Sequence, residues 1–256
     1  MKEKAIAKVI SQAEIAANIF DMWIETGLAK EAHPGQFIGV FPKNKSTILP
    51  RPISICEVNE DKTALRIVYR IAGQGTKEFS SFAAGDDVEI LGILGNGFPL
   101  EAGKGKKVFL MGGGIGVPPI LQLAKELEAD KQVVVGYRDN GLFLKDELDK
   151  YATVYVATED GSVGTKGNVM NAIEENGLDA EVIYACGPMP MLRAIKRYAE
   201  EKGIKAYISL EEHMACGVGA CLGCVVKTKE VDHHSHVHNA RICTDGPVFD
   251  AEEVDI

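Results

Sequence analysis

The sequence predicts a mixed α and β protein with three parts: an antiparallel β-barrel, a doubly wound parallel α/β domain and a small cysteine-rich module. Three observations support this fold class. Short β segments separated by turns fill the first hundred residues, apolar strands then alternate with amphipathic helices, and three cysteines crowd into residues 216–224. We therefore expect domains at residues 1–101, 102–210 and 211–256.

The barrel is expected from five β-like segments, which carry β-branched and aromatic residues in alternation or in short clusters. They read KAIAKVISQ, ANIFDMWIET, GQFIGVFP, TALRIVYRIA and DDVEILGIL. Turn-forming stretches such as HPG, NEDK and AAGDD separate them. This arrangement resembles a small antiparallel barrel.

The α/β domain is expected from four repeats of an apolar strand followed by an amphipathic helix. The strands are VFLMGG, QVVVGYR, TVYVATED and AEVIYACG, and a last strand, KAYISLEE, leads into the cysteines. Continuous runs of Val, Ile and Tyr are typical of parallel strands that are covered on both faces. The four helices are therefore expected on the two faces of one parallel sheet.

Composition limits the function classes. The chain has 256 residues, 46% of them hydrophobic, a net charge of −9 and a pI near 5.3. This charge argues against nucleic acid or an anionic membrane surface as the main partner. We find neither a secretory signal pattern nor an apolar run of membrane-spanning length, so we expect a cytoplasmic protein with reduced thiols. Closely spaced cysteines in a reducing compartment suggest a metal site.

The cysteine module carries the strongest motif. Three cysteines have the spacing C-x4-C-x2-C and a fourth follows after 18 intervening residues; they are Cys216, Cys221, Cys224 and Cys243. This is the plant-type ferredoxin arrangement around a [2Fe-2S] cluster. The intervening glycines, Gly217, Gly219 and Gly223, allow the backbone to curl around a cluster. A structural zinc site is the alternative, although zinc usually takes two closely spaced cysteine pairs.

A histidine group and one further cysteine are expected to bind no metal. The segment DHHSHVH contains His233, His234, His236 and His238. We expect a solvated hairpin face there rather than a second metal site, because the cluster already has four thiolates. Cys56 is expected to be a small buried hydrophobe without chemistry.

Several motifs in the barrel half resemble the flavin-binding motifs of the ferredoxin-NADP reductase superfamily: PGQF at residues 34–37, RPISIC from Arg51, and IVYRIAGQGTKEFS. Arg51 offers a forked cation for phosphate, Ser54 a hydrogen bond to the flavin ring, and Gly75–Thr76 a helix start with a hydroxyl. The resemblance implies an FAD site formed by Arg51, Pro52, Ile53, Ser54, Val68, Tyr69, Arg70, Gly75 and Thr76.

A glycine-rich turn is expected to bind the nicotinamide dinucleotide. FLMGGGIGVPPI places glycines between a strand and a helix, at Gly112, Gly113, Gly114 and Gly116. Such a turn cradles phosphate against a helix N-terminus, although this one is not the G-x-G-x-x-G fingerprint. The superfamily also has a Cys-Gly-Pro turn beside the nicotinamide, which corresponds here to Cys186, Gly187 and Pro188.

Two further acidic positions are expected near these cofactors. By the resemblance, Glu159 and Asp160 in ATEDGSVG reach the adenosine ribose, where a carboxylate accepts a hydrogen bond from a free 2′-hydroxyl and repels a 2′-phosphate. NAD is therefore expected in preference to NADP; a solvated turn is the alternative. Glu211 or Glu212, at the end of the last strand, is expected close to the flavin.

The order of these motifs resembles, over nearly the whole chain, the electron transfer subunits of NAD-dependent dihydroorotate dehydrogenase B. That resemblance implies FAD, a [2Fe-2S] cluster, NAD as co-substrate, and an FMN-containing catalytic subunit that oxidises dihydroorotate in pyrimidine (UMP) biosynthesis, in a heterotetramer with two copies of each subunit. No Ser-His-Asp, paired-carboxylate or catalytic cysteine arrangement is found, so no catalytic residue for dihydroorotate is expected in this chain.

Two alternatives remain open at this point. The chain also resembles the flavin and iron-sulfur subunits of cytoplasmic hydrogenases and of NADH-dependent ferredoxin-NADP reductases, which share all three parts. The more distant alternative is a non-enzymatic binding module with zinc held by the four cysteines. Fold alone does not decide between electron acceptors.

Overall fold

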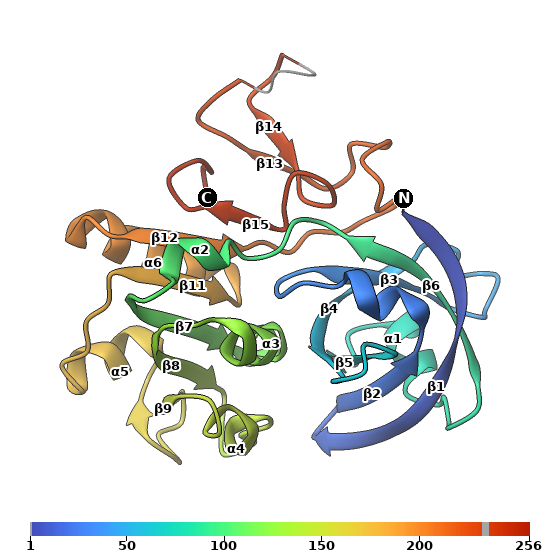
Figure 1. The fold of residues 1–256 in the computed structure, drawn as a ribbon, viewed down its shortest axis with the longest axis horizontal. Helices are drawn as coiled ribbons and strands as arrows, with labels where there is room; N and C mark the ends of the chain where they lie inside the picture. The colour runs from blue at the N-terminus through green and yellow to red at the C-terminus, as the bar shows by residue number, and fades with distance from the viewer. Residues whose placement is uncertain (1, 232–235) are drawn as a thin grey trace.

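The computed structural model describes residues 2–231 and 236–256 of the chain. Figure 1 shows three parts: a barrel formed by the N-terminal strands, a sheet with its helices beside it, and a small C-terminal module above both. The antiparallel barrel, the α/β sheet and the mixed fold class predicted from the sequence are confirmed.

The barrel closes in the order β1-β2-β5-β4-β3-β6, and every pair of neighbours is antiparallel. Its strands are β1 (Glu3–Ala16), β2 (Ile19–Glu25), β3 (Phe37–Phe41), β4 (Arg51–Val58), β5 (Ala64–Arg70) and β6 (Asp87–Leu94), with the short helices η1 (Gly27–Glu31) and α1 (Gln74–Phe79) between them. Side chains such as Met22, Ile38 and Ile67 fill the interior and are fully buried. The barrel is therefore closed by a packed apolar core.

The sheet has the strand order β10-β9-β8-β7-β11-β12-β15. Its strands are β7 (Lys107–Gly113), β8 (Asp130–Tyr137), β9 (Thr153–Thr158), β10 (Thr165–Lys166), β11 (Val182–Cys186), β12 (Lys205–Ser209) and β15 (Val248–Asp250). The helices are α2 (Leu100–Gly103), η2 (Gly114–Gly116), α3 (Pro118–Glu126), α4 (Lys145–Leu148), α5 (Val169–Glu175) and α6 (Met189–Lys202).

Helices cover both faces of this sheet, as expected for a doubly wound domain. Ile120 of α3 and Leu148 of α4 belong to one buried apolar cluster. Ile173 of α5 and Ile195 of α6 belong to the other. The chain runs outward from β7 to β9 and then returns to start β11 beside β7, so the strand order reverses between β7 and β11. Ligands of open α/β sheets bind at such a point, outside the carboxyl ends of the strands.

The structure adds β4 to the five segments expected for the barrel and β10 to the strands expected for the sheet, and two further details differ. The strand predicted to be the last, β12, is followed at the sheet edge by β15, which comes from the C-terminal module and pairs antiparallel with it. The helix predicted after β8 is reduced to the four residues of α4, because Leu144 before it adopts a left-handed φ of 64°.

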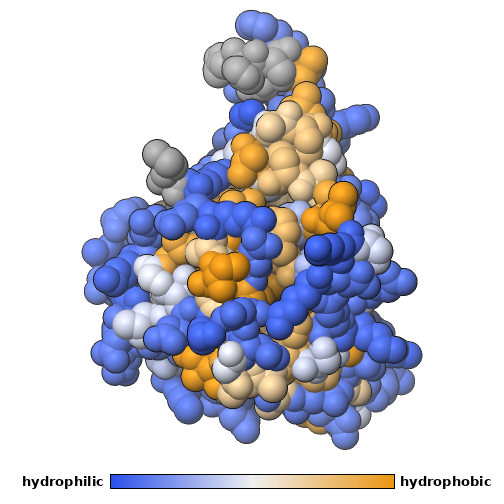
Figure 2. All heavy atoms as spheres, turned by 90° about the vertical axis from the view of Figure 1, so that its right-hand side faces the viewer, coloured by the Kyte–Doolittle hydropathy of each residue, from blue (hydrophilic) through white to orange (hydrophobic). Residues whose placement is uncertain are grey.

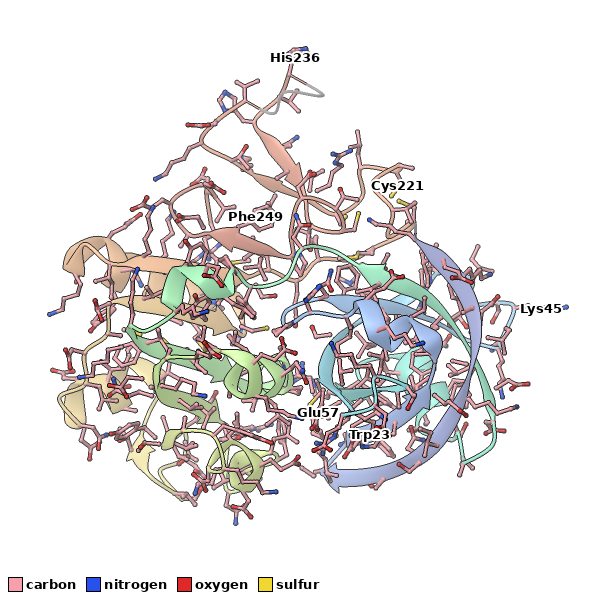
Figure 3. The ribbon with its side chains drawn as sticks, viewed as in Figure 1. Trp23, Lys45, Glu57, Cys221, His236 and Phe249 are labelled. Carbon is pink, nitrogen blue, oxygen red and sulfur yellow. The ribbon has the colours of Figure 1, made fainter. Side chains whose placement is uncertain are left out.

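The C-terminal module contains one antiparallel pair, β13 (Val225–Lys227) with β14 (Asn239–Arg241). His233 and His234 lie outside the described residues, and His238 Nδ1 lies 3.1 Å from the Lys229 carbonyl oxygen. Figure 3 shows Phe249 beneath the module, against the sheet. Phe249 shares a buried cluster with Phe37 and Leu94 of the barrel, so the three parts are packed around a common core.

We predict that Phe249→Ala destabilises the module and its neighbours together. The side chain is buried, and deleting a buried aromatic ring costs about 3 kcal/mol. Thermal unfolding followed by circular dichroism is expected to show a lower midpoint. Val163→Ala, at an exposed loop position, serves as the control and is expected to leave the midpoint unchanged. An unchanged midpoint for Phe249→Ala contradicts the shared core.

Candidate functional site

A cavity of about 700 Å³ lies where the barrel, the sheet and the start of the C-terminal module meet. Strands β4 and β5 of the barrel form one wall, Ile115 from the glycine-rich turn reaches another, and residues 209–214 complete it. All of the residues expected to bind FAD line this cavity except Gly75. The volume lies within the range of cofactor pockets.

Gly75 lies directly behind Arg51. A Cβ at Gly75 would approach Arg51 Nε to 2.7 Å, so the missing side chain leaves room for the guanidinium against the start of α1. Arg51 also donates a hydrogen bond of 2.5 Å to the Leu49 carbonyl oxygen. These two contacts hold the Arg51 guanidinium in the lining of the cavity.

Thr76 behaves differently from the sequence-based expectation. Its hydroxyl oxygen accepts hydrogen bonds from the backbone N–H groups of Ala72, at 2.9 Å, and Gly73, at 3.1 Å. The hydroxyl therefore stabilises the turn into α1 instead of pointing freely at an anion. Arg51 is left as the side chain at this end that is best placed to pair with phosphate.

The sequence did not indicate several cavity residues, because they come from loops far apart in the chain. These are Leu49, Pro50, Ala72, Ile115, Ser209, Leu210, His213, Met214 and Pro247. Their only sequence signal is position: residues 209–214 follow directly after a parallel strand, and strand ends of this kind border ligand sites.

Glu211 and Glu212 both line the cavity. Glu211 is accessible from the open cavity, yet protein atoms surround most of its carboxyl group. This burial raises the pKa of Glu211, and the nearby Arg70 guanidinium opposes the shift. A carboxyl group with a raised pKa therefore stands at the boundary between the cavity and the cysteine module.

The glycine-rich turn and the Cys-Gly-Pro turn meet where the strand order reverses. Gly112 on β7 is the register partner of Cys186 on β11. A Cβ at Gly116 would lie 2.3 Å from the Cys186 carbonyl oxygen, and one at Gly113 would lie 2.9 Å from Cδ of Pro188. Only glycine fits this approach, which brings the two expected nucleotide-binding turns into direct contact.

Cys186 itself is fully enclosed by protein. Burial raises the pKa of its thiol well above the ordinary value, and the Glu211 carboxylate acts in the same direction. The thiol is therefore neutral near pH 7, and its position is set by packing.

Glu159 and Asp160 form the turn after β9. The Asp160 carboxylate accepts a 2.9 Å hydrogen bond from the Ser162 N–H, and its pKa is lowered by this partner. The Asp160 N–H in turn donates to the carbonyl oxygen of Arg138, at the end of β8. Asp160 is thus engaged within its own loop, which leaves Glu159 as the acidic side chain better able to contact a ribose.

The four cysteines of the module come together in two pairs. Cys216 and Cys221 are close enough to influence each other's ionisation, and so are Cys224 and Cys243. The Cys216 Sγ also accepts hydrogen bonds from the backbone N–H groups of Val218, at 3.4 Å, and Ala220, at 3.3 Å. The Gly223 N–H also donates to the Cys221 Sγ, at 3.4 Å, so the N–H groups that point at sulfur come from the expected glycines or from residues next to them.

Two of these glycines have the backbone conformation that the loop requires. Gly217 and Gly219 adopt φ values of 68° and 82°, in the left-handed region. A Cβ at Gly219 would also lie 2.8 Å from Thr244, the residue after Cys243. The loop therefore closes against the segment that carries the distant cysteine.

The two cysteine pairs differ in their surroundings. Burial opposes ionisation of Cys216, but the N–H groups of Val218 and Ala220 and the contact with Cys221 outweigh it and lower the pKa of Cys216 to about 6. Burial and the neighbouring Cys224 raise the pKa of Cys243 to about 11. Cys221 is exposed, whereas Cys224 and Cys243 are buried.

The four thiols and the N–H groups that point at sulfur suit an iron-sulfur cluster. Among residues 2–231 and 236–256, no group of three or more His, Cys, Asp or Glu side chains is close enough to hold one metal ion. A [2Fe-2S] cluster takes four protein ligands, two on each iron, which matches the four cysteines of the module. The backbone N–H groups aimed at sulfur are also typical of such clusters.

Comparison with known proteins agrees with this geometry. Residues 211–255 match the family model of the iron-sulfur cluster binding domain of dihydroorotate dehydrogenase B. An electron transfer subunit of dihydroorotate dehydrogenase B (NAD(+)) from Bacillus cereus (strain B4264) is 42% identical, with 99% of each chain covered. The corresponding subunit from Bacillus anthracis (strain CDC 684 / NRRL 3495) is 41% identical over the same share.

The chain belongs to the family of dihydroorotate dehydrogenase B electron transfer subunits. Solved structures share its fold. An NADH-dependent reduced ferredoxin-NADP oxidoreductase aligns with a TM-score of 0.86 and 28% identity, covering 98% of this chain and 90% of that one. A ferredoxin NADP+ reductase from Neisseria gonorrhoeae aligns with a TM-score of 0.68 at 15% identity, covering 83% and 95% of the two chains.

These comparisons favour the dihydroorotate dehydrogenase B family over the alternatives. The full-length relatives at 42% identity are closer to this chain than the ferredoxin-linked structure at 28%. The match at residues 211–255 is to an iron-sulfur domain, which argues against the zinc alternative. In the part of the chain that the structure describes, no helix is both long and apolar enough to cross a membrane.

We predict that Gly116→Ala weakens NAD binding by at least about tenfold, because the new methyl group must displace either the glycine-rich turn or the end of β11. Titration with NAD by calorimetry measures the change. Gly27→Ala is the control, since a Cβ at Gly27 meets nothing within 4 Å. Unchanged affinity in Gly116→Ala, with FAD content retained, contradicts the assigned turn.

Proposed function

We propose that this chain passes electrons from the FMN of a catalytic subunit, through a [2Fe-2S] cluster and FAD, to NAD, and so couples dihydroorotate oxidation to NAD reduction. The observation that carries the proposal is the short chain distance between the cavity and the cysteines. Met214 lines the cavity two residues before Cys216, and Pro247 lines it four residues after Cys243. Two short segments of the chain, residues 214–216 and 243–247, therefore join the expected FAD site to the expected cluster site.

The cofactor set suits such a relay. FAD, when bound, exchanges a hydride with NAD and single electrons with an iron-sulfur cluster. The chain supplies the surroundings: Arg51 for the pyrophosphate, Ser54 for the flavin ring, and the two turns at Gly116 and Cys186 for the nicotinamide dinucleotide. Val68, Tyr69 and Arg70 form the neighbouring wall of the groove.

Tyr69 is held rigidly in that wall. Its hydroxyl donates a 2.7 Å hydrogen bond to Gln12, and the Gln12 amide group donates to the carbonyl oxygens of Phe79 and Phe82. The ring also stacks on Phe20, with 5.9 Å between the centroids. A groove wall fixed in this way orients a planar ring with little loss of entropy on binding.

The partner is proposed to dock beside the outer cysteine pair. Val218 and Leu222, on either side of Cys221, are 42% and 57% exposed. Figure 3 shows Cys221 at the outer edge of the module, and Figure 2 shows apolar side chains gathered on the module above the barrel. Apolar side chains around an exposed redox ligand are typical of a protein contact surface.

The chemistry of dihydroorotate is assigned to the partner. Glu211, whose carboxyl group has a raised pKa, lines the cavity and borders the proposed FAD site. The cavity residues of β4 and β5 that the sequence predicted are assigned to FAD. Dihydroorotate oxidation therefore requires the catalytic subunit, and a heterotetramer with two of each subunit is the assembly we propose.

We predict that this chain alone oxidises NADH with artificial acceptors but does not oxidise dihydroorotate. Mixing it with an FMN-loaded dihydroorotate dehydrogenase catalytic subunit is expected to produce NADH from dihydroorotate, followed at the NADH absorption band. Cys221→Ser is expected to lower that coupled rate at least about tenfold, because a hydroxyl is a poor ligand for cluster iron. Its NADH oxidation with artificial acceptors is expected to persist.

Cys56→Ala is the matched control, because Cys56 is a buried thiol in β4 outside the cysteine module. It is expected to retain both activities and the iron content. If the two folded, fully loaded subunits neither associate nor form NADH, the proposal is wrong and the hydrogenase-type or ferredoxin-linked alternative gains support. Zinc without iron in anaerobically purified protein contradicts the cluster assignment.

We predict that NADH is preferred over NADPH by at least about tenfold in kcat/KM, as expected for a single charge contact at the ribose. The Glu159 carboxylate accepts from the 2′-hydroxyl and repels a 2′-phosphate. Glu159→Gln is expected to narrow the ratio, whereas Glu175→Gln, on α5, leaves it unchanged. Equal steady-state rates with both nucleotides for the unmodified chain refute the assignment of this turn.

A further inference from the structure

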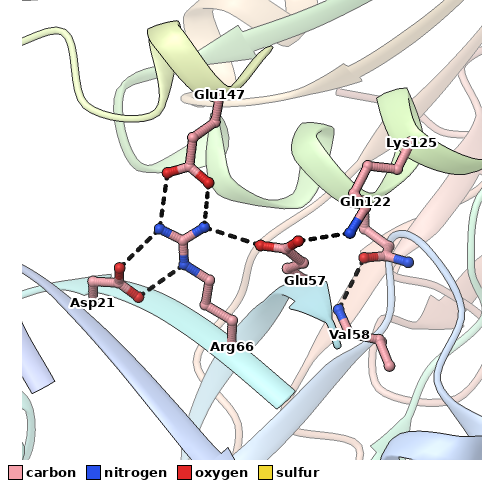
Figure 4. Close-up of polar contacts among 7 residues, drawn as sticks. All are labelled: Asp21, Glu57, Val58, Arg66, Gln122, Lys125 and Glu147. Carbon is pink, nitrogen blue, oxygen red and sulfur yellow. Dashed lines mark hydrogen bonds and ion pairs between the residues drawn. The ribbon is translucent and has the colours of Figure 1, made fainter. Parts of the chain in front are cut away.

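Arg66 stands at the centre of a buried ion network on the side of the barrel that faces the sheet. The residue is only 7% exposed. Its Nε and one terminal nitrogen donate to Asp21, at 2.9 and 2.8 Å, and the other terminal nitrogen donates to Glu57 at 3.0 Å. Glu147 accepts from both terminal nitrogens, at 2.6 and 2.9 Å. All five N–H donors of the guanidinium are therefore used (Figure 4).

The network joins two domains. Asp21, Glu57 and Arg66 belong to strands β2, β4 and β5 of the barrel, whereas Glu147 belongs to α4 on the sheet side. Without Glu147, two of the five donors lose their partner at a buried site. Pairing with Glu147 and Asp21 outweighs burial and keeps the pKa of Arg66 above its ordinary value. The Arg66 guanidinium therefore has all of its hydrogen-bond partners only when the sheet domain contacts the barrel.

A second set of contacts crosses the same boundary between the barrel and the sheet domain. Here the cation belongs to the sheet domain and the carboxylate to the barrel. Lys125, in the last turn of α3, donates to Glu57 at 2.6 Å. One turn earlier, the Gln122 side chain accepts a 2.9 Å hydrogen bond from the buried backbone N–H of Val58. Glu147 of α4 offers a carboxylate to the barrel, whereas Lys125 of α3 offers an ammonium group. A displacement of α3 and α4 together along the barrel therefore breaks both ion pairs.

The position of α3 controls the position of the glycine-rich turn. Helix α3 begins at Pro118, two residues after Gly116, and Lys125 lies about 10 Å further along its axis. At the far end, Ile115 of the turn lines the cavity. The same strands, β4 and β5, carry the network at one end and the cavity wall at the other.

We propose that the Arg66–Glu147 and Lys125–Glu57 pairs are a register lock, which holds α3 on β4 and thereby sets the distance between the nicotinamide-binding turn and the flavin cavity. The inference rests on the proposed function for its effect on electron transfer. Arg66, Glu147 and Lys125 are positioning residues, because they touch neither the cavity nor the two nucleotide-binding turns. A displacement of about 1 Å at the reacting groups is sufficient to cost up to a hundredfold in rate.

The test uses Glu147→Ala and Lys125→Ala, because replacing Arg66 itself leaves the half-buried Asp21 and Glu147 carboxylates unpaired and risks unfolding. Lys145→Ala is the matched control: it lies on the same helix as Glu147, but its partner is Asp149 in the same domain. The full-length, FAD-loaded chain is reduced with saturating NADH in a stopped-flow instrument. FAD content and thermal midpoint are recorded alongside.

A second measurement is independent of activity. Hydrogen–deuterium exchange reports on the Val58 amide, whose hydrogen bond to Gln122 exists only while the domains are locked. We expect faster exchange in the peptide that contains Val58 for both variants, and unchanged exchange in the β1–β2 hairpin. The rate constant for FAD reduction is expected to fall at least about tenfold at saturating NADH, with FAD content retained.

The double variant gives the last criterion. If the two pairs form one lock, the effects of Glu147→Ala and Lys125→Ala are not additive. Unchanged hydrogen exchange at Val58 contradicts the register lock. Faster exchange at Val58 with an unchanged rate constant for FAD reduction shows that the network is only structural, and it contradicts the positioning role. An unmodified chain that NADH fails to reduce contradicts the proposed function instead, while the exchange measurement still decides whether the pairs hold the domains.

Discussion

The pairing of β15 with β12 is the contact on which the relation between the three parts depends. Strand β12 leaves the sheet into the cysteine loop, and β15 brings the chain back to the same edge, where the Leu210 N–H donates to the Pro247 carbonyl oxygen at 2.8 Å. The barrel joins this point through Asn96, whose backbone N–H donates to Gly246. Both ends of the cysteine segment are thus anchored beside the cavity.

This anchoring gives the proposed electron path a direction. The inner cysteines, Cys224 and Cys243, are buried in the core shared by the three parts, while the outer pair, Cys216 and Cys221, lies toward solvent. The inner pair is connected to the cavity by the few residues that end at Pro247. A cluster held in this way has one side against the flavin domain and the other available to a partner.

How far the sequence could predict this molecule follows from the range of the interactions involved. Strand and helix patterns, the glycine-rich turn and the cysteine spacing depend on residues close together in the chain, so they could be recognised. Strand β15, only three residues long, pairs with a strand about forty residues away, and nothing in its own sequence indicates the partner. The shortening of α4 was also missed, because nothing in the local pattern indicates the left-handed conformation of Leu144 before it.

By itself, the sequence determined which chemical groups are available: four closely spaced thiols, an arginine in a barrel strand, and glycines where two backbones approach. The tertiary structure decided which groups meet. It paired the cysteines into an inner and an outer set, occupied the Thr76 hydroxyl within its own turn, and placed Pro247 in the cavity wall. It also turned Arg66, an ordinary arginine in a strand pattern, into a buried cation whose five donors need three carboxylates from distant segments. Residue type is local information, whereas the satisfaction of a buried charge depends on contacts that only the folded chain provides.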